Sequence, residues 1–504
     1  MRKKYLVWRV FALVTILVTV GVLTASAAAY TASPPVLASA AVSPFAGCTA
    51  DAGQVGTVYA NTEVEPWVDV NPTNPANIVA TWQQDRWNNG GSRGLVAGVS
   101  TDGGTSWSQV VVPGLSVCSG NATLKRASDP WLTFAPNGDL YHMSLSTSTG
   151  ITAQGFPDSA MLVSKSVNGG LAWSAPVTLK FDQGPNVLND KNSITADPND
   201  PDFVYAVWDR LTLASGKAPP LEVFEHAIGY RGPTWFARTT DGGNNWEPAR
   251  MIYDPGAVKQ TIGNQIVVHP QSEGGDLFDF FNLIYNFKNA KGVRGMNVAF
   301  LRSTDQGETW SEQAQIIDKL FRAVIRDPQD GALVRTGDII PDVAVDPDNG
   351  NLYVVWQDLR FSGKADIAFT MSEDGGVTWS PTMKINGNSG TAQAFTPSVH
   401  VAEDGTVGVS FYDFRSDVAG DGQLTTDHWL LHCHSDCDSP SNWTDETRVT
   451  PVSFDMRAAP IAGGFFVGDY VGLSSIGDDF ASLFVSTTAP FPSADAFFSL
   501  VGAP

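Results

Sequence analysis

The chain of 504 residues has few charged side chains, and basic ones are the scarcer kind. Only 16% of its residues are charged, with 31 Lys and Arg against 52 Asp and Glu. So low a charge content excludes a coiled coil and a disordered acidic tail. The formal net charge of −21 repels phosphate backbones, so we expect no nucleic-acid partner.

Cysteine is also scarce, with four residues. Cys433 and Cys437 are close in sequence, so we expect them to bridge each other and Cys48 to pair with Cys118. The alternative is a zinc site, because three histidines stand beside the first pair: His428, His432 and His434. The sequence indicates no cofactor, and a structural calcium ion stays open.

One long apolar run stands near the N-terminus, from Val10 to Leu23. Basic residues precede it, and the small residues Ala25-Ser-Ala27 follow it. This order predicts a secretory signal peptide over residues 1–27, with an uncleaved membrane anchor as the alternative. We therefore expect a secreted, extracellular protein with no stable membrane insertion after cleavage.

Glycine, proline and aromatic residues are plentiful, and an eight-residue motif recurs five times. "STDGGTSW", Ser100 to Trp107, is the first copy, and its third residue is Asp or Asn in every copy: Asp102, Asn168, Asp241, Asp305 and Asp374. The Asp side chain can accept backbone N–H bonds, glycine supplies the positive φ of a turn, and the Trp ring can pack on a neighbouring unit. The motif therefore predicts a turn that fastens one repeat to the next.

Each copy follows a pair of β-strand patterns, as in "PDVAVDPDNGNLYVVWQDLR" from Pro341 to Arg360. Counting these pairs predicts an all-β propeller of seven four-stranded antiparallel blades, with six blades as the alternative. We expect residues 57–504 to form this single domain after an Ala-, Pro- and Ser-rich segment over 28–56. A strand over Gly56–Ala60 is expected to complete the last blade. The protein is expected to be a monomer.

The octet matches Ser-x-Asp-x-Gly-x-x-Trp, the Asp-box or BNR repeat, and the chain resembles the sialidase superfamily. This resemblance implies a β-propeller that hydrolyses terminal glycosidic bonds of extracellular glycans, as an exo-α-sialidase does, with a carbohydrate or glycoconjugate as partner. Sialidases have six blades and an Arg-Ile-Pro tripeptide before the first octet, and this chain has no such tripeptide. A non-catalytic propeller that binds glycan or protein at its channel mouth is the alternative, and a glycosidase or lyase with paired carboxylates is a third possibility.

The strand order predicts where chemistry can occur. The octets close the turn between strands three and four, so the ends of strand two lie at the opposite end of each blade. Those ends carry Asp and Arg together: Asp85-Arg86, Asp209-Arg210, Asp358 with Arg360, and Asp413 with Arg415. Strand one begins at the same end with acids: Glu65, Asp129, Asp338 and Asp469. The arginines either bind an anionic substrate or form structural salt bridges between blades.

The resemblance also implies roles for single residues. Sialidases use three arginines on the substrate carboxylate, for which the candidates are Arg86, Arg210, Arg360 and Arg415. Tyr470 is the candidate nucleophile, assisted by Glu222 or Glu225, and Asp85 and Asp129 are candidate acids. Tyr470 packing in the central channel is the alternative.

Two insertions interrupt the repeats, at Leu211–Pro233 and at Lys319–Arg335. The second has a short helical pattern in "KLFRAVIRD". Either insertion is positioned to cover a site.

Overall fold

The computed structural model describes residues 29–152, 155–213, 230–270, 275–285, 295–387, 392–443 and 445–503. Within these residues the fold is all-β, as predicted, with three single-turn 3₁₀ helices: Val117–Ser119, Pro440–Asn442 and Met456–Ala458. None of the helices in this part of the chain is long and apolar enough to cross a membrane.

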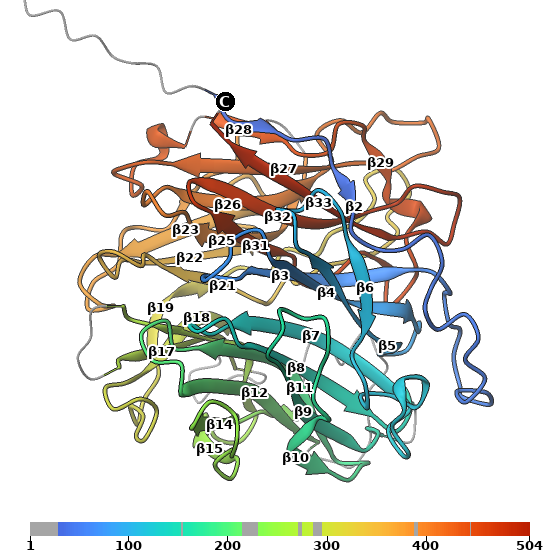
Figure 1. The fold of residues 1–504 in the computed structure, drawn as a ribbon. Coiled ribbons are helices and arrows are strands. Elements are labelled where there is room, and N and C mark those ends of the chain that lie inside the picture. The colour runs from blue at the N-terminus through green and yellow to red at the C-terminus, as the bar shows by residue number, and fades with distance from the viewer. Residues whose placement is uncertain are drawn as a thin grey trace, which may run out of the picture.

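The strands form antiparallel sheets that radiate from a centre (Figure 1). The first three four-stranded units are β3–β6 (Glu63–Val70, Ile78–Arg86, Ser92–Ser100, Ser108–Val111), β7–β10 (Arg126–Phe134, Leu140–Thr147, Ser159–Ser166, Val177–Asp182) and β11, β12, β14 and β15 (Val187–Ala196, Phe203–Leu213, Thr234–Thr240, Arg250–Tyr253). The next are β16–β19 (Lys259–Val268, Leu277–Tyr285, Gly295–Ser303, Gln315–Leu320), β21–β24 (Asp342–Val345, Leu352–Asp358, Asp366–Ser372, Met383–Lys384) and β25–β28 (Ala394–Val401, Val407–Asp413, Thr425–Cys433, Asp445–Arg448). The last begins with β31–β33 (Gly472–Ile476, Asp479–Ser486, Asp495–Gly502).

The first strands of these units form a closed ring. In the described part of the chain, β3, β7, β11, β16, β21, β25 and β31 contact one another in this order, and β31 contacts β3. Each unit presents its first strand to the centre and its fourth to the outside, which defines a β-propeller. The hydrophobic core lies between neighbouring sheets, where Trp82, Trp208 and Trp356 are fully buried.

The strand that completes the last unit differs from the prediction. β1 (Thr31–Ala32) and β2 (Val36–Leu37) pair with β33, so part of the segment 28–56 belongs to this sheet. Residues 56–60 lead directly into β3, an innermost strand, and Val58 bridges Trp87 instead. The strand that pairs with the open edge of β33 is the fourth and outermost of its sheet, and lies about 14 Å from the innermost strand β31 at the usual strand spacing. An earlier part of the chain than residues 56–60 occupies this position.

The helical pattern predicted for "KLFRAVIRD", Lys319–Asp327, is wrong. Residues 321–333 form no helix, and the segment ends in β20 (Val334–Arg335), which pairs in parallel with β30 (Phe465–Phe466). Its backbone is held by the neighbouring unit, since Leu359 N–H donates to the Phe321 carbonyl at 2.8 Å. These tertiary hydrogen bonds replace those of a helix. Most of the other insertion, 214–229, lies outside the described residues.

The octets act as predicted. Asp102 accepts hydrogen bonds from the Ser106 hydroxyl at 2.6 Å, from Ser106 N–H at 2.9 Å and from the Ser100 hydroxyl at 2.8 Å. These bonds, and that of the Ser106 hydroxyl most of all, lower its pKa. The Trp107 ring lies 5.2 Å from that of Phe498 on β33, the neighbouring sheet. Gly104 packs on the same ring, so close that a Cβ atom would lie 2.1 Å from Phe498 Cε1. The motif thus closes a turn and fixes one unit to another.

Candidate functional site

The octets and the ends of the second strands lie at opposite ends of each unit, as predicted. In the first unit, Ile78 at the start of β4 pairs with Ser100 of the octet, whereas Gln84 near its end pairs with Gly94. Arg86 is therefore separated from Asp102 by the length of the strand.

At the end away from the octets, several first strands share an unusual backbone conformation. Glu65, Asp129 and Lys191 have φ values of 54°, 51° and 43°, and the pairing register shifts at each of them. Gly263 and Thr396 occupy the same position in two further units. A left-handed residue other than glycine costs about 1 kcal/mol or more, and such strain concentrates at functional sites. The bulges place three charged side chains at one end of the ring.

These three residues line a cleft together with charged residues of other units. We call this site the cleft; its charged residues are Glu65, Arg86, Asp129, Asp190, Lys191, Arg335, Asp338 and Asp469. Its lining also includes a group of aliphatic residues, which we call the aliphatic wall: Leu145, Ile151, Leu188, Ile262 and Ile339. Arg335, the last residue of the insertion Lys319–Arg335, lines the cleft.

Asp129 and Asp190 are neighbouring carboxyl groups in the cleft. Asp129 Oδ2 accepts a hydrogen bond from Lys191 N–H at 3.1 Å, and its Oδ1 accepts one from the Ser128 hydroxyl at 2.7 Å. Both side chains are largely buried. Burial, with the charge of Asp129 next, raises the pKa of Asp190 to about 7. Asp190 therefore holds a proton near neutral pH beside a second carboxylate.

An ion network lies next to this pair. Arg335 binds Asp469 through two hydrogen bonds of 2.7 and 3.1 Å, and Lys191 Nζ lies 2.5 Å from Asp469 Oδ2. Lys191 Nζ also lies 3.4 Å from Glu65 Oε1. Burial raises the pKa of Glu65 to about 7 against the charge of Lys191, whereas Arg335 and Lys191 lower that of Asp469 although burial opposes them. The network fixes the Lys191 side chain, whose backbone orients Asp129.

Arg86 reaches the cleft, as predicted. Its Nη1 donates to Gln83 Oε1 at 2.5 Å, and Gln83 in turn donates to Glu65. The guanidinium groups of Arg86 and Arg335 lie over the same Phe466 ring, 5.1 and 4.5 Å from its centroid. The Nε atom of Arg86 is buried and has no hydrogen-bond partner among the described residues. Two guanidinium groups therefore stand together at one side of the cleft.

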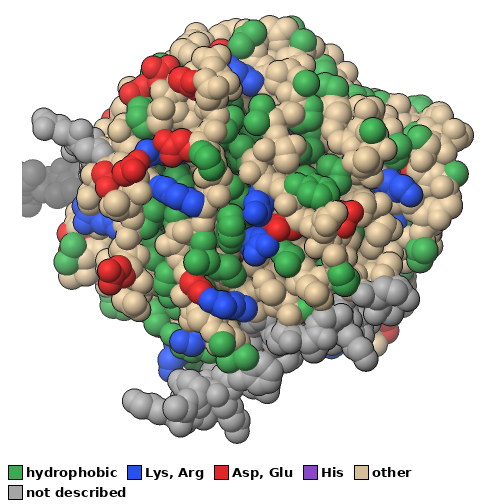
Figure 2. All heavy atoms as spheres, turned by 90° about the horizontal axis from the view of Figure 1, so that it is seen from below, with side chains coloured by type: hydrophobic (Ala, Val, Ile, Leu, Met, Phe, Trp, Pro, Cys, Tyr) green, Lys and Arg blue, Asp and Glu red, His purple; other side chains and the backbone are tan. Residues whose placement is uncertain are grey.

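The other three predicted arginines do not line the cleft. Arg210 binds Asp182 on the outer strand of the preceding unit at 2.7 and 2.8 Å. Arg360 pairs with Asp358 and Asp318, and Arg415 pairs with Asp413 and Glu446. The face in Figure 2 likewise has Lys and Arg side chains beside Asp and Glu rather than a broad patch of one sign. These pairs correspond to the structural interpretation of the Asp-Arg repeats.

Of the predicted catalytic residues that the structure describes, Asp129 alone lines the cleft. Asp85 points elsewhere, accepting hydrogen bonds from the Ser43 hydroxyl at 2.9 Å and from Asn61 N–H at 2.7 Å. The Tyr470 hydroxyl donates to the Pro130 carbonyl at 3.0 Å. Burial raises the Tyr470 pKa well above its ordinary value, which opposes ionisation of a nucleophile. Glu222 and Glu225 lie outside the described residues.

Tyr470 packs as the channel alternative predicts. Its ring lies 5.3 Å from that of Trp131 and 6.1 Å from that of Trp67, and the two Trp rings stack at 3.5 Å. These rings come from the first and second units and from the segment before β31. Trp67 and Trp131 also line a cavity among the innermost strands.

Sequence reasoning missed Asp190, Lys191 and Arg335. A usable pattern exists for Lys191, because the left-handed residue precedes Pro or Asn in each unit that has it. The corresponding stretches are Glu65-Pro-Trp, Asp129-Pro-Trp, Lys191-Asn-Ser, Gly263-Asn-Gln and Thr396-Pro-Ser. No comparable pattern marks Arg335, which an insertion brings to the cleft.

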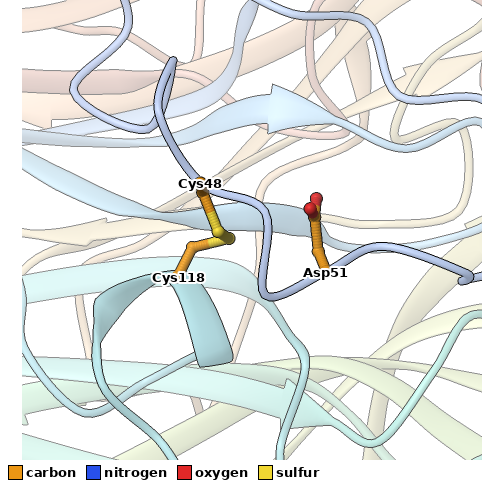
Figure 3. A group of neighbouring side chains, drawn as sticks. All are labelled: Cys48, Asp51 and Cys118. Atoms are coloured by element: carbon orange, nitrogen blue, oxygen red, sulfur yellow. A yellow bond between two sulfur atoms is a disulfide. The ribbon is translucent and has the colours of Figure 1, made fainter.

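The cysteines form the two predicted disulfides, Cys48–Cys118 and Cys433–Cys437. In the Cys433–Cys437 disulfide neither sulfur is a free thiolate, so these two cysteines cannot be the zinc ligands of the alternative prediction. Cys48, Asp51 and Cys118 lie side by side (Figure 3), but the two sulfurs are bonded to each other. Asp51 accepts a hydrogen bond from Arg93 Nε at 2.7 Å. This group therefore does not offer the thiolate ligands that a zinc ion needs.

Comparison with known proteins supports the repeat assignment. Residues 234–455 match the family model of the BNR repeat-like domain. The sheets define the chain as a β-propeller, and this region is similar to the BNR repeat-like domain family. The predicted resemblance to the sialidase superfamily is thus confirmed at the level of the repeat.

Similar solved structures include glycosidases. The α-L-arabinanase of Penicillium chrysogenum, complexed with arabinobiose, is 15% identical, with 76% of this chain and 94% of that chain covered and a TM-score of 0.47. The intramolecular trans-sialidase of Ruminococcus gnavus is 13% identical, with coverages of 90% and 98% and a TM-score of 0.41. The Hadza microbial sialidase Hz136 is 15% identical, with coverages of 69% and 63% and a TM-score of 0.42. A search of curated protein sequences gives no match.

Proposed function

We propose that this protein is a glycoside hydrolase that cleaves a terminal glycosidic bond in the cleft. The observation that carries the proposal is the pair Asp129 and Asp190. One carboxyl group holds a proton near neutral pH while its neighbour is oriented by the Lys191 backbone. Glycosidases need such a pair, in which one group protonates the leaving oxygen and the other acts as base or nucleophile.

In this mechanism Asp190 donates its proton to the glycosidic oxygen as the bond to the anomeric carbon breaks. Asp129 either activates the attacking water or attacks the anomeric carbon itself. The aliphatic wall limits access of water from the other side of the cleft. Lys191 is held by Asp469 and acts as a positioning residue rather than as a proton donor, and Arg335 holds the same carboxylate through its Nε and Nη2 atoms.

The substrate class we propose first is a sialoside. The Asp-box repeats support it, as does the pair of guanidinium groups at Phe466, which suits a sugar carboxylate. The arrangement differs from the one implied by the resemblance, because Arg86 and Arg335 would bind the substrate in place of Arg210, Arg360 and Arg415. α-L-Arabinosides are the second class, since arabinobiose is bound in one of the similar structures.

The test is hydrolysis of a fluorogenic α-sialoside and of an aryl α-L-arabinofuranoside by the purified chain. Asp190→Asn and Asp129→Asn should each lower kcat/KM by about 10³-fold or more. Asp102→Asn, the same change in an octet at the far end of the unit, should leave kcat/KM unchanged. Tyr470→Phe tests whether Tyr470 is the nucleophile, as the resemblance implies. Turnover that survives both cleft substitutions contradicts the assignment. Saturable sugar binding without turnover would instead indicate a carbohydrate-binding propeller.

A further inference from the structure

One buried arginine contacts two of the loops that line the cleft. The first loop, residues 87–91 after β4, lines the cleft with residues 90–91, and the second loop, residues 148–151 after β8, lines it with residues 149–151. Arg126, the first residue of β7, is not part of the described lining, and its side chain is fully buried. A Cβ atom on Gly150 would lie 2.5 Å from Arg126 Nη1. The guanidinium group therefore packs directly against the backbone of the second loop.

The same guanidinium group donates four hydrogen bonds to two other segments. Its Nη1 donates to the Gly90 carbonyl at 2.7 Å and to Asn89 Oδ1 at 2.8 Å, both in the first loop. Its Nη2 donates to the Val55 carbonyl at 2.7 Å, and its Nε donates to Gln54 Oε1 at 2.7 Å. One side chain thus joins the first loop to the N-terminal part of the chain.

The two loops are also bonded to each other. Ile151 N–H donates to the Asn89 carbonyl at 3.0 Å, and Trp87 N–H closes the first loop by donating to the Gly91 carbonyl at 2.9 Å. The guanidinium group of Arg126 lies over the Trp87 ring, 4.2 Å from its centroid. Arg126 therefore holds the first loop directly, and the second loop both by packing and through the first.

The charge of Arg126 is held in an unusual way. Its four acceptors are neutral oxygen atoms and none of them is a carboxylate. A buried guanidinium group without a carboxylate is costly, and burial, with the charge of Arg86 next, lowers the pKa of Arg126 to about 9. A guanidinium group nevertheless offers what a neutral side chain lacks, because it has five N–H donors in one rigid plane. This arrangement suits a group that holds several carbonyl oxygens at fixed positions.

We propose that Arg126 is a positioning residue of the cleft, which fixes the two loops relative to Asp129. Arg126 and Asp129 lie on the same strand, β7, three positions apart. The contacts of Arg126 therefore set where the backbone of Gly90 and Gly150 lies with respect to the Asp129 carboxylate. The effect on turnover rests on the proposed function, since a substrate between these groups reacts only when its position is closely fixed.

The test is Arg126→Lys in the full chain, which keeps the positive charge but offers one nitrogen to four acceptors. Amide hydrogen exchange of Trp87 and Ile151, whose N–H groups are bonded within the loops, should become faster by about tenfold or more. With the fluorogenic α-sialoside or the aryl α-L-arabinofuranoside, kcat should fall by about tenfold or more and KM should change less. Guanidinium chloride, at concentrations far below those that unfold the protein, should restore part of the turnover of Arg126→Ala, and ammonium chloride should not.

Arg93→Lys is the matched control. Arg93 also holds the N-terminal part of the chain, but through an ordinary ion pair in which its Nε lies 2.7 Å from Asp51 Oδ2, and it is not part of the described cleft lining. This variant should leave loop exchange and turnover within about twofold. Equal effects of Arg93→Lys and Arg126→Lys would overturn the proposal, because they would show that any attachment of the N-terminal part is enough.

Unchanged exchange of both loops in Arg126→Lys would also overturn it. If neither Arg126 variant folds, Gln54→Ala removes one acceptor at a partly exposed position and should speed exchange in the first loop by a smaller factor. No change in this variant then contradicts the proposal. If the unmutated chain cleaves neither glycoside, the proposed function fails, whereas the exchange comparison still decides whether Arg126 fixes the two loops.

Discussion

Lys191 N–H donates a hydrogen bond to Asp129 Oδ2 at 3.1 Å, although the two residues belong to different units and are 62 positions apart. Both residues have left-handed backbones at the innermost strand of their unit. The strained backbone of the third unit thus presents the N–H group that orients a carboxylate of the preceding unit. This relationship connects the repeat architecture to the proposed chemistry and leads to four predictions.

The first prediction concerns the pH dependence caused by Asp190. Its pKa is raised from 3.8 to about 7 in the folded chain, so folding binds a proton between these values. The contribution of Asp190 to stability is therefore present at low pH and is lost as pH rises from about 4 through about 7. Asp190→Asn should flatten this part of the curve and raise stability at pH 8, measured by urea unfolding, while activity is lost. For the unmutated enzyme, kcat/KM should fall as pH rises through about 7, and an unchanged unfolding curve would contradict the assigned protonation.

A second prediction compares the two glycines of the first octet. Gly103 and Gly104 both have positive φ, but only Gly104 faces a neighbouring ring. Gly103→Ala should cost about 1 kcal/mol from backbone strain alone, and Gly104→Ala about 2–4 kcal/mol because Phe498 must shift. Thermal or urea unfolding measures both. Equal losses would show that the fastening contact contributes nothing.

A third prediction separates structural arginines from those of the cleft. Arg210→Ala should lower stability by about 1 kcal/mol through loss of its two hydrogen bonds to Asp182, which is partly exposed, and should leave kcat/KM unchanged. Arg86→Ala should lower kcat/KM for a sialoside strongly. The assay pairs unfolding midpoints with turnover for each variant. A loss of turnover in Arg210→Ala at unchanged stability would contradict its structural role and would indicate that Arg210 contacts the substrate.

A fourth prediction addresses the cost of the bulges. Thr396 is left-handed at φ 51°, lies outside the cleft lining, and its buried hydroxyl has no partner among the described residues. Thr396→Gly should therefore raise stability by about 1 kcal/mol. Thr370→Gly, in the interior of β23, is the control and should lower stability by a similar amount. A loss of stability in Thr396→Gly would show that its side chain is held favourably.

Local sequence was sufficient to predict the repeating part of the molecule. The octets close turns and fix neighbouring sheets because Asp102, Gly104 and Trp107 each act over a few residues or at one contact. The direction of each strand then follows, so the end of the unit that carries Arg86 was also predictable. The disulfides were predictable from the small number of cysteines.

Tertiary structure decided which of the repeated charges meet. Arg86 and Arg210 each follow an Asp at the end of a second strand, yet one lies beside Phe466 and the other binds Asp182, because each partner comes from another part of the chain. Arg335 reaches the cleft through pairing of β20 with β30, which no local pattern encodes. The last unit is completed by residues 31–37 because its open edge lies far from β3. The sequence by itself thus determined the repeated unit, whereas the closing of the ring determined the site, since Lys191 contacts Asp129 and Asp469, which come from other parts of the ring, and Arg335 binds the same Asp469.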